Sequence, residues 1–204
     1  MPAKRERAQE TRRRIIEQAA RAIRAEGIER VGVGELMGRL GLTHGGFYAH
    51  FSSKEALAAE AIAAALAEQC EHLLAASEAG PAALVDVYLS RAHRDQPEQG
   101  CPLPAVAPEV VHGSEQLRHA FTEALRGYAA RLAGRLPGED PAAREETALA
   151  LLSGMCGALL ISRAVDDSAL ADRILSAARA AWHRLLAQPI GVQSSTRTPS
   201  GSET

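Results

Sequence analysis

Residues 40–55, LGLTHGGFYAHFSSKE, are of types that suit a binding surface better than a packed interior. Thr43 is a natural N-cap, whose hydroxyl accepts a backbone amide of the following turn, so a short helix should begin at His44. Gly45 and Gly46 then fall in its first turn, although each glycine costs about 1 kcal/mol relative to alanine in a helix interior. A glycine pair lets another molecule approach the backbone closely. The chemistry on offer is therefore non-covalent binding.

Aromatic residues give this short helix an inner and an outer side. Phe47 and Phe51 lie four positions apart and can face inward together, whereas His44 and Tyr48 fall on other faces. The helix is therefore predicted to be anchored on one side and exposed on the other.

Two amphipathic helices are predicted before this stretch. The second has Gly32 as its N-cap and Gly41 just after its end. Its apolar residues follow the i, i+3, i+4, i+7 template at Val33, Leu36, Met37 and Leu40. The first ends at Gly27, and its apolar stripe consists of Ile15, Ile16, Ala19, Ala20 and Ile23. A helix, a short glycine turn and a second helix form the helix-turn-helix pattern.

Residues 11–57 resemble the N-terminal DNA-binding domain of the TetR family of transcriptional regulators. The positions that carry the resemblance are Thr11, Ile15, Ala19, Gly27, Val33, Gly41, Gly46, Tyr48, Phe51, Lys54 and Leu57. The family usually carries Thr or Ser near Val31 and Gly32, where a hydroxyl caps the second helix and touches phosphate. In this chain that contact would fall to a backbone amide of Gly32 or Val33.

The resemblance implies that this part of the chain binds a double-stranded DNA operator. Thr43, Tyr48 and Lys54 occupy positions that usually touch phosphate, and the first turn of the recognition helix, at His44, would reach base edges. Taken without the resemblance, His44, Tyr48 and His50 can also be interpreted as core residues. The complete set of implied DNA-contacting residues is Gly32, Val33, Thr43, His44, Gly45, Gly46, Tyr48, His50 and Lys54.

The charge distribution agrees with a nucleic-acid partner, although the total charge does not. Lys and Arg number 23 against 25 Asp and Glu, which gives a net charge of −2. Basic residues nevertheless gather near the N-terminus, where a basic surface suits phosphates. On its own, such a run is more typical of a solvated helix face. The residues are Lys4, Arg5, Arg7, Arg12, Arg13, Arg14, Arg21 and Arg24, against Glu6, Glu10 and Glu17.

The chain of 204 residues, rich in Ala and Leu, is long enough for one or two helical domains. We predict a helix-turn-helix domain over residues 1–52, a helical ligand-binding and dimerisation domain over 53–188, and a disordered tail over 189–204. No apolar run approaches the roughly 18 to 20 residues that cross a bilayer, and no apolar signal region follows the charged start. We therefore expect a cytoplasmic protein without membrane association. The odd number of cysteines favours reduced thiols over disulfides.

The second domain is predicted to begin with a long helix that connects the two parts. Ser52 and Glu55 have capping-box spacing, so this helix should begin at once with Lys54 in its first turn and run to about residue 79. Gly80 and Pro81 end it, and the next helix is expected over 82–94.

The remaining pattern predicts a loop and three more helices. Residues 95–108 contain four prolines and are predicted to be a loop or a few short turns. A helical pattern over 109–136 is interrupted at Gly113 and Ser114, with Ser114 as a cap, and Asp140 is the predicted cap of the next helix. The last two helices, 142–165 and 168–187, are the most apolar. The resemblance implies that they pair with their copies in a homodimer.

The helices of the second domain are predicted to enclose a pocket for a small-molecule inducer. Ligand sites are largely apolar with a few polar groups, and this composition is found here. Tight core packing explains any single residue equally well. The candidate lining residues are Leu66, Cys70, Leu73, Val87, Tyr88, Cys101, Phe121, Leu125, Tyr128, Met155 and Leu159.

Other function classes find less support. The motifs of serine hydrolases, phosphate-binding loops, dinucleotide-binding folds and zinc proteases are absent from the sequence, so neither an enzyme nor a cofactor is predicted. Cys70, His72, Cys101 and His112 could meet in a metal site, which keeps a metal-responsive regulator open. Cys101 is also a candidate sensing thiol if it is exposed near positive charge. A helical interaction module that does not bind DNA is the remaining alternative.

The preferred interpretation is an all-α protein with an N-terminal three-helix helix-turn-helix domain, followed by a helical ligand-binding and dimerisation domain. We expect it to act as a repressor that a small molecule releases from its operator.

Overall fold

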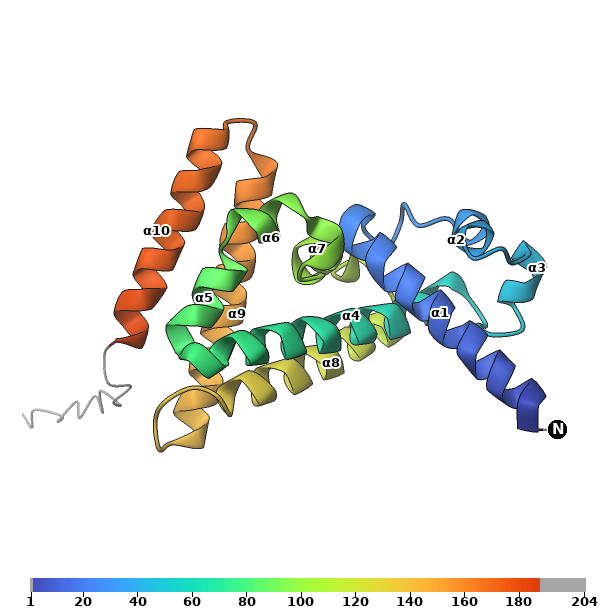
Figure 1. Cartoon of the computed structure of the whole chain (residues 1–204), viewed down its shortest axis with the longest axis horizontal. Helices are drawn as coiled ribbons and strands as arrows, with labels where there is room; N and C mark the ends of the chain where they lie inside the picture. The colour runs from blue at the N-terminus through green and yellow to red at the C-terminus, as the bar shows by residue number, and fades with distance from the viewer. Residues whose placement is uncertain (1, 188–204) are drawn as a thin grey trace, which may run out of the picture.

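The computed structural model describes residues 2–187, with side chains from Lys4 onward, and every regular element in that range is helical (Figure 1). The all-α prediction is confirmed, while the predicted tail at 189–204 lies outside the described residues. The elements are α1 (Pro2–Glu26), α2 (Val33–Arg39), α3 (His44–Phe47), α4 (Lys54–Ala76), η1 (Ser77–Ala79), α5 (Pro81–Tyr88), α6 (Arg91–Asp95), η2 (Pro97–Gln99), α7 (Leu103–Val110), α8 (Glu115–Ala133), α9 (Pro141–Ala164) and α10 (Ser168–Leu186).

The helices are arranged along an elongated molecule with two different ends (Figure 1). At one end, α2 and α3 lie beside α1, and at the other α9 and α10 form a pair. Between them α4 and α8 run side by side, and α1 packs against α4. The long helix α4 therefore connects the helix-turn-helix unit to the larger helical part.

Two arginines fasten α1 to α4. Arg12 pairs with Glu60 at 2.5 Å. Arg24 is almost fully buried; its guanidinium donates to the Ala65 carbonyl at 3.0 Å and pairs with Glu68 at 2.6 Å. A buried cation without partners would be strongly unfavourable, so these contacts fix where α1 lies along α4.

Side-chain caps begin several helices at the predicted residues. The Thr43 hydroxyl accepts the Gly46 amide at 3.3 Å, and Ser114 begins α8 by accepting the Leu117 amide at 3.2 Å. Asp140 likewise accepts a backbone amide in the first turn of α9. Each interaction satisfies one of the amides that a helix start leaves unpaired.

The predicted capping box at the start of α4 is wrong by one residue. Ser53 rather than Ser52 is the N-cap, and its hydroxyl accepts the Ala56 amide at 3.0 Å. Glu55 does not reach back along its own helix. Its carboxylate accepts the backbone amide of Ser114 at 3.2 Å, because the start of α8 also leaves an amide in need of a partner.

The single helix predicted over 82–94 is two helices. α5 ends at Tyr88, and Ser90 begins α6 by accepting the His93 amide at 3.1 Å. A serine hydroxyl that bonds a nearby amide offers the backbone an alternative to continuing the helix. The chain therefore turns at Leu89 and Ser90.

The loop predicted over 95–108 also contains a helix, α7. Pro104 lies in the first turn of α7, where the missing amide costs nothing because it would have no partner. Pro108 lies inside the helix and removes one backbone hydrogen bond. Packing offsets that loss, since the buried residues of α7 include Leu103, Val106 and Val110.

Within residues 2–187, α9 is the one helix that is long and apolar enough to cross a membrane by length and composition alone. The prediction that no segment reaches this length is wrong in that respect. Core helices of soluble proteins pass the same test. α9 packs against α8 and α10 and buries Leu151, Leu152, Met155 and Leu159.

Candidate nucleic-acid interface and helical core

The outer face of α3 is open at its glycines. A Cβ atom added at Gly45 would have no heavy atom within 4 Å, so nothing in the chain covers this position. At Gly46 an added Cβ would lie 3.4 Å from the Thr43 hydroxyl and 3.9 Å from the Met37 side chain. A side chain at Gly46 would thus make ordinary contacts with Thr43 and Met37, while Gly45 leaves backbone free for a partner.

Two phenylalanines hold α3 from beneath, as predicted. Phe47 and Phe51 are both buried, and their stacked rings lie 5.5 Å apart. The Arg12 guanidinium lies 4.7 Å from the centre of the Phe51 ring, a cation–π contact with α1. The short helix is thus rigidly positioned although it has only four residues.

His44 and Tyr48 lie together on the exposed side of α3. The Tyr48 side chain is 64% exposed, and its ring centre lies 6.0 Å from that of His44. Thr43 is exposed as well, whereas His50 is only half-exposed. The geometry therefore brings Thr43, His44, Gly45 and Tyr48 to one surface, with His50 at its margin.

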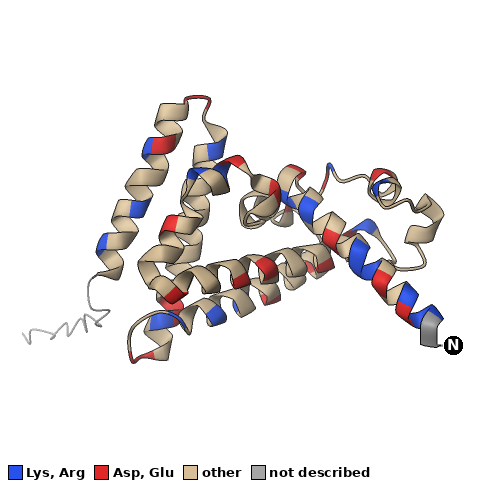
Figure 2. Ribbon diagram, in the orientation of Figure 1, with Lys and Arg blue, Asp and Glu red and all other residues tan. Residues whose placement is uncertain are grey.

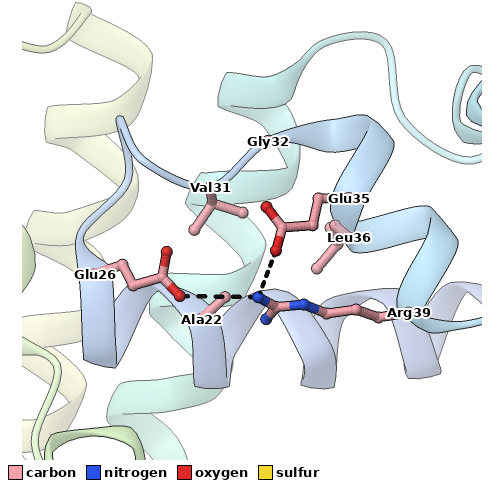
Figure 3. Close-up of a pocket in the computed structure, with 7 residues that line it drawn as sticks. All are labelled: Ala22, Glu26, Val31, Gly32, Glu35, Leu36 and Arg39. Atoms are coloured by element: carbon pink, nitrogen blue, oxygen red, sulfur yellow. Dashed lines mark hydrogen bonds and ion pairs between the residues drawn. The ribbon is translucent and has the colours of Figure 1, made fainter.

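The start of α2 has no side-chain cap, as the glycine at its N-cap position requires. Gly32 is exposed and Val33 half-buried, so the first amides of α2 remain open to a partner. Figure 3 shows the seam between α1 and α2 beside it, where Arg39 pairs with Glu35 at 2.7 Å and reaches Glu26 at 4.0 Å. The cavity at this seam has a volume of about 10 Å³ and suits a water molecule, not a ligand.

Lys54 is engaged within the chain. Its Nζ donates to the backbone carbonyl of Glu29 at 2.8 Å, which ties the start of α4 to the turn between α1 and α2. An ammonium group carries three donors, so this bond leaves further donors for a phosphate.

The basic N-terminal run is partly neutralised by its neighbours (Figure 2). Arg13 pairs with both Glu10 and Glu17, and Arg12 pairs with Glu60. Among residues 4–187, no carboxylate pairs with Lys4, Arg5, Arg7 or Arg14, which remain available to phosphates. The basic surface is therefore smaller than the residue count suggests.

Two clefts of the helical part contain residues of the single pocket predicted, and a third, about 410 Å³ between residues 89–91 and α10, contains none of them. The first, about 180 Å³ between α4 and α8, is mostly apolar and contains three of the predicted residues, Leu66, Cys70 and Tyr128. The second, about 210 Å³, contains Val87 and is otherwise lined by Gln69, His72, Ser90, Ala92, His93, Gln96, Gln99 and Gly100.

The other predicted lining residues belong to the packed core or its edge. Leu73, Tyr88, Cys101, Met155 and Leu159 are fully buried. Phe121 and Leu125 are half-buried and pack against this core. Side-chain packing therefore closes the space that the sequence pattern left open.

Residues 15–61 match the family described as bacterial regulatory proteins, tetR family. Residues 77–177 match the C-terminal domain described as LmrA/YxaF-like transcriptional regulator. The chain belongs to the TetR family. It is therefore a DNA-binding transcriptional regulator and not an enzyme.

Solved TetR-family structures share this fold over most of their length. E. coli NemR in its reduced form is 22% identical, with a TM-score of 0.67 over 84% of this chain and 94% of that one. A TetR-family regulator from Cytophaga hutchinsonii is 24% identical, with a TM-score of 0.68 over 85% and 94% of the two chains. A TetR regulator from Chloroflexus aurantiacus is also 24% identical, with a TM-score of 0.66 over 88% and 97%. No curated protein sequence matches this chain significantly.

In this TetR-family chain the exposure that a sensing role for Cys101 would require is not found. Its side chain is 0% exposed, and burial raises the pKa of the thiol to about 11. Burial also raises the pKa of Cys156 to about 12 and that of Cys70 above its ordinary value. Because the thiolate is the reactive form, these raised pKa values disfavour reaction of all three thiols in this conformation.

The alternative metal site is not formed. Among residues 4–187, no three His, Cys, Asp or Glu side chains are placed to share a metal ion. Cys70 and His72 both lie on α4, whereas Cys101 precedes α7 and His112 follows it, and the four side chains do not converge.

Two tyrosine hydroxyls of the core lack partners of good geometry. The Tyr88 and Tyr128 hydroxyls are enclosed without a geometrically sound hydrogen bond, although the Cys101 thiol lies near the first and Gln69 near the second. Burial raises the pKa of both phenols well above their ordinary value. No local pattern indicates these groups, because only the packing of α4, α5, α8 and the segment before α7 brings them together.

Proposed function

We propose that this TetR-family regulator binds a near-palindromic operator as a homodimer, with one α3 in each of two successive major grooves. The observation that carries the proposal is the bare outer face of α3, open at Gly45 and flanked by the exposed Tyr48, above the buried Phe47 and Phe51. A recognition helix needs this combination of a rigid base and an accessible surface.

The roles of the individual residues follow from their positions. Thr43, Tyr48 and Lys54 contact phosphates, and the open amides at Gly32 and Val33 contact one more. His44 reaches a base edge beside Gly45 and Gly46, and His50 contributes at the margin. Phosphate contacts set register, and His44 contributes sequence preference.

The homodimer forms through α9 and α10. These two helices expose large apolar side chains that a monomer would leave in water, namely Leu149, Leu160, Ile161, Leu170 and Leu185. An isologous contact between two copies of this pair would cover them and place the two α3 helices on the same side.

A small molecule releases the protein from DNA. The cleft between α4 and α8, about 180 Å³, is comparable with an engineered cavity of about 150 Å³ that binds benzene. Small, mostly apolar compounds therefore fit it, with Glu123 and Arg131 among the polar residues lining the cleft. The inducer must bind the DNA-free geometry more tightly, since equal affinity for both states shifts nothing. The proposed compartment is the cytoplasm, where operator and metabolites meet.

The test begins with selection of DNA sites from a random library by the purified protein, followed by footprinting on the DNA that flanks its gene. We expect a two-fold symmetric site, a dimer by sedimentation and an affinity that falls steeply with salt. Binding that does not depend on salt, or no selected site, would contradict the proposal and favour an interaction module without DNA binding.

A further inference from the structure

The carboxylate of Glu109, on α7, holds a turn that is distant in sequence. Its Oε2 accepts the backbone amides of Ile28 at 2.7 Å and Glu29 at 2.8 Å. Both amides belong to the turn between α1 and α2. Hydrogen bonds to a charged acceptor are about twice as strong as neutral ones, so this pair is a firm attachment.

The turn is shaped to accept this carboxylate. Gly27 ends α1 with a φ of +84°, a conformation that glycine adopts without strain. A Cβ atom at Gly27 would overlap Oε1 of Glu109, so the carboxylate occupies the space where a side chain would be. Gly27 therefore serves both the backbone turn and the approach of α7.

The same turn is held from a second direction by Lys54, whose Nζ donates to the Glu29 carbonyl at 2.8 Å. Beyond the turn the chain enters α2, which Arg39 links back to Glu26 at the end of α1. The direction in which α2 and α3 leave α1 is therefore set where α7 and α4 meet the turn.

The opposite end of α7 is also attached. The amide of Cys101, just before α7, donates to His93 Nε2 at 2.8 Å. Because Nε2 accepts, the ring proton lies on Nδ1 and is donated to the Tyr88 carbonyl at 2.6 Å. α7 thus spans from the edge of the second cleft, which His93 lines, to the end of α1, beside which it lies in Figure 1.

From these contacts we infer that Glu109 is a positioning residue for operator binding: through its bonds to Ile28 and Glu29 it fixes the helix-turn-helix unit on α7. In the dimer this contact sets the separation and rotation of the two α3 helices. The inference rests on the proposed binding of a dimer to a two-fold symmetric operator.

Three substitutions of Glu109 distinguish the effect of its hydrogen bonds to the turn from the effect of its negative charge. Glu109→Gln keeps an oxygen that can accept both amides but loses the charge. Glu109→Asp keeps the charge but is one methylene too short to reach them, and Glu109→Ala loses both. Glu139→Ala is the matched control, because Glu139 is an exposed glutamate in the turn between α8 and α9, far from α1.

The experiment uses the site that the wild-type protein selects from random DNA, together with versions whose half-sites are moved apart or together by one base pair. One base pair changes the rotation between half-sites by roughly 35°. We expect the Asp and Ala variants to bind the optimal site about tenfold more weakly, with Gln within about threefold of wild type. The Asp and Ala variants should also lose most of the wild-type preference for one spacing, and their Ile28 and Glu29 amides should exchange with deuterium at least about tenfold faster.

If only the negative charge of Glu109 matters, the order of operator affinities is reversed. The Asp variant then binds like wild type, and the Gln variant binds as weakly as the Ala variant. That order, or an unchanged spacing preference in folded Asp and Ala variants, would overturn the inference while operator binding stands. If the Ala variant does not fold, the Asp and Gln pair decides the question. Wild-type protein that selects no DNA would overturn both this inference and the proposed function.

Discussion

The two ends of the molecule treat a tyrosine hydroxyl in opposite ways. At the DNA-binding end, Tyr48 holds its hydroxyl in solvent above a firmly packed base. In the helical core, Tyr88 and Tyr128 hold theirs away from water with no partner of good geometry. An unsatisfied buried polar group costs about 1–3 kcal/mol. The first end is thus ready to bind as it stands, whereas the core gives up stability that a ligand offering a hydrogen bond could restore.

The largest expected effect tests the base of the DNA-binding end. Phe47→Ala empties a fully buried site beneath α3, beside Phe51, and should destabilise the protein by about 3–5 kcal/mol. DNA binding should be lost with it, because α3 no longer has a fixed position. Thermal unfolding and DNA affinity are measured together. Val111→Ala, at an exposed apolar residue after α7, is the control and should change neither.

The next prediction concerns how the stability of the helical core depends on pH. Burial lowers the pKa of His93 from 6.5 to about 4. Between these values the unfolded chain binds a proton that the folded chain does not, so stability falls as the pH falls through this window. The expected loss from this group is about 3 kcal/mol at pH 4.

Replacement of His93 by Gln checks that assignment. The variant should be less stable than wild type at pH 7, because the bonds to Cys101 and Tyr88 are weakened, yet it should lose less stability on acidification. Urea midpoints at pH 7 and pH 4.5 give the comparison. Parallel pH profiles for the two proteins would show that His93 is not the group responsible.

A smaller effect removes one hydroxyl at the DNA-binding end. Tyr48→Phe should weaken binding to all DNA sequences by about five- to tenfold, since one phosphate hydrogen bond is lost. The dependence of affinity on salt should not change, because a neutral hydroxyl releases no counterion. Stability should also stay the same, as the side chain is exposed. Titrations at several salt concentrations test all three statements, and unchanged affinity would remove Tyr48 from the interface.

The smallest effect removes the same atom in the core. Tyr88→Phe deletes a buried hydroxyl without a sound partner and should stabilise the protein by about 0.5–1 kcal/mol. Operator affinity without inducer should stay the same. The result of interest is the sign: a loss of stability would mean that the Cys101 thiol is a better partner than its geometry indicates.

The sequence also predicts the structure of the DNA-binding end more completely than that of the helical core. The caps at Thr43 and Ser114, the turn at Gly41 and the burial of Phe47 and Phe51 all depend on residues within a few positions of each other. Such signals are local, and their outcomes were predicted. The wrong choice between Ser52 and Ser53 shows the limit, because two adjacent serines offer the same chemistry.

The structure of the helical core was predicted less well, because the contacts that determine it join segments that are distant in sequence. Residues 95–108 have the composition of a loop, yet burial of Leu103 and Val106 stabilises α7 despite Pro108. Gly27 was recognised as a helix end, but nothing local indicates that the carboxylate beside it comes from Glu109. The burial of Cys101 likewise depends on the fold around it, which is why the sequence left both a packed and a sensing thiol open.

The length of α4 has a geometric consequence for induction. Its 23 residues span about 35 Å, at 1.5 Å per residue. If α4 pivots near its end at Ala76, Cys70 in the first cleft lies about 9 Å from the pivot, and Lys54 about 33 Å from it. A sideways shift of about 1 Å at Cys70 then becomes nearly 4 Å at Lys54, slightly more than the rise of one base pair, about 3.4 Å. A compound that displaces one side chain by less than a bond length can thus move the protein out of step with the DNA helix.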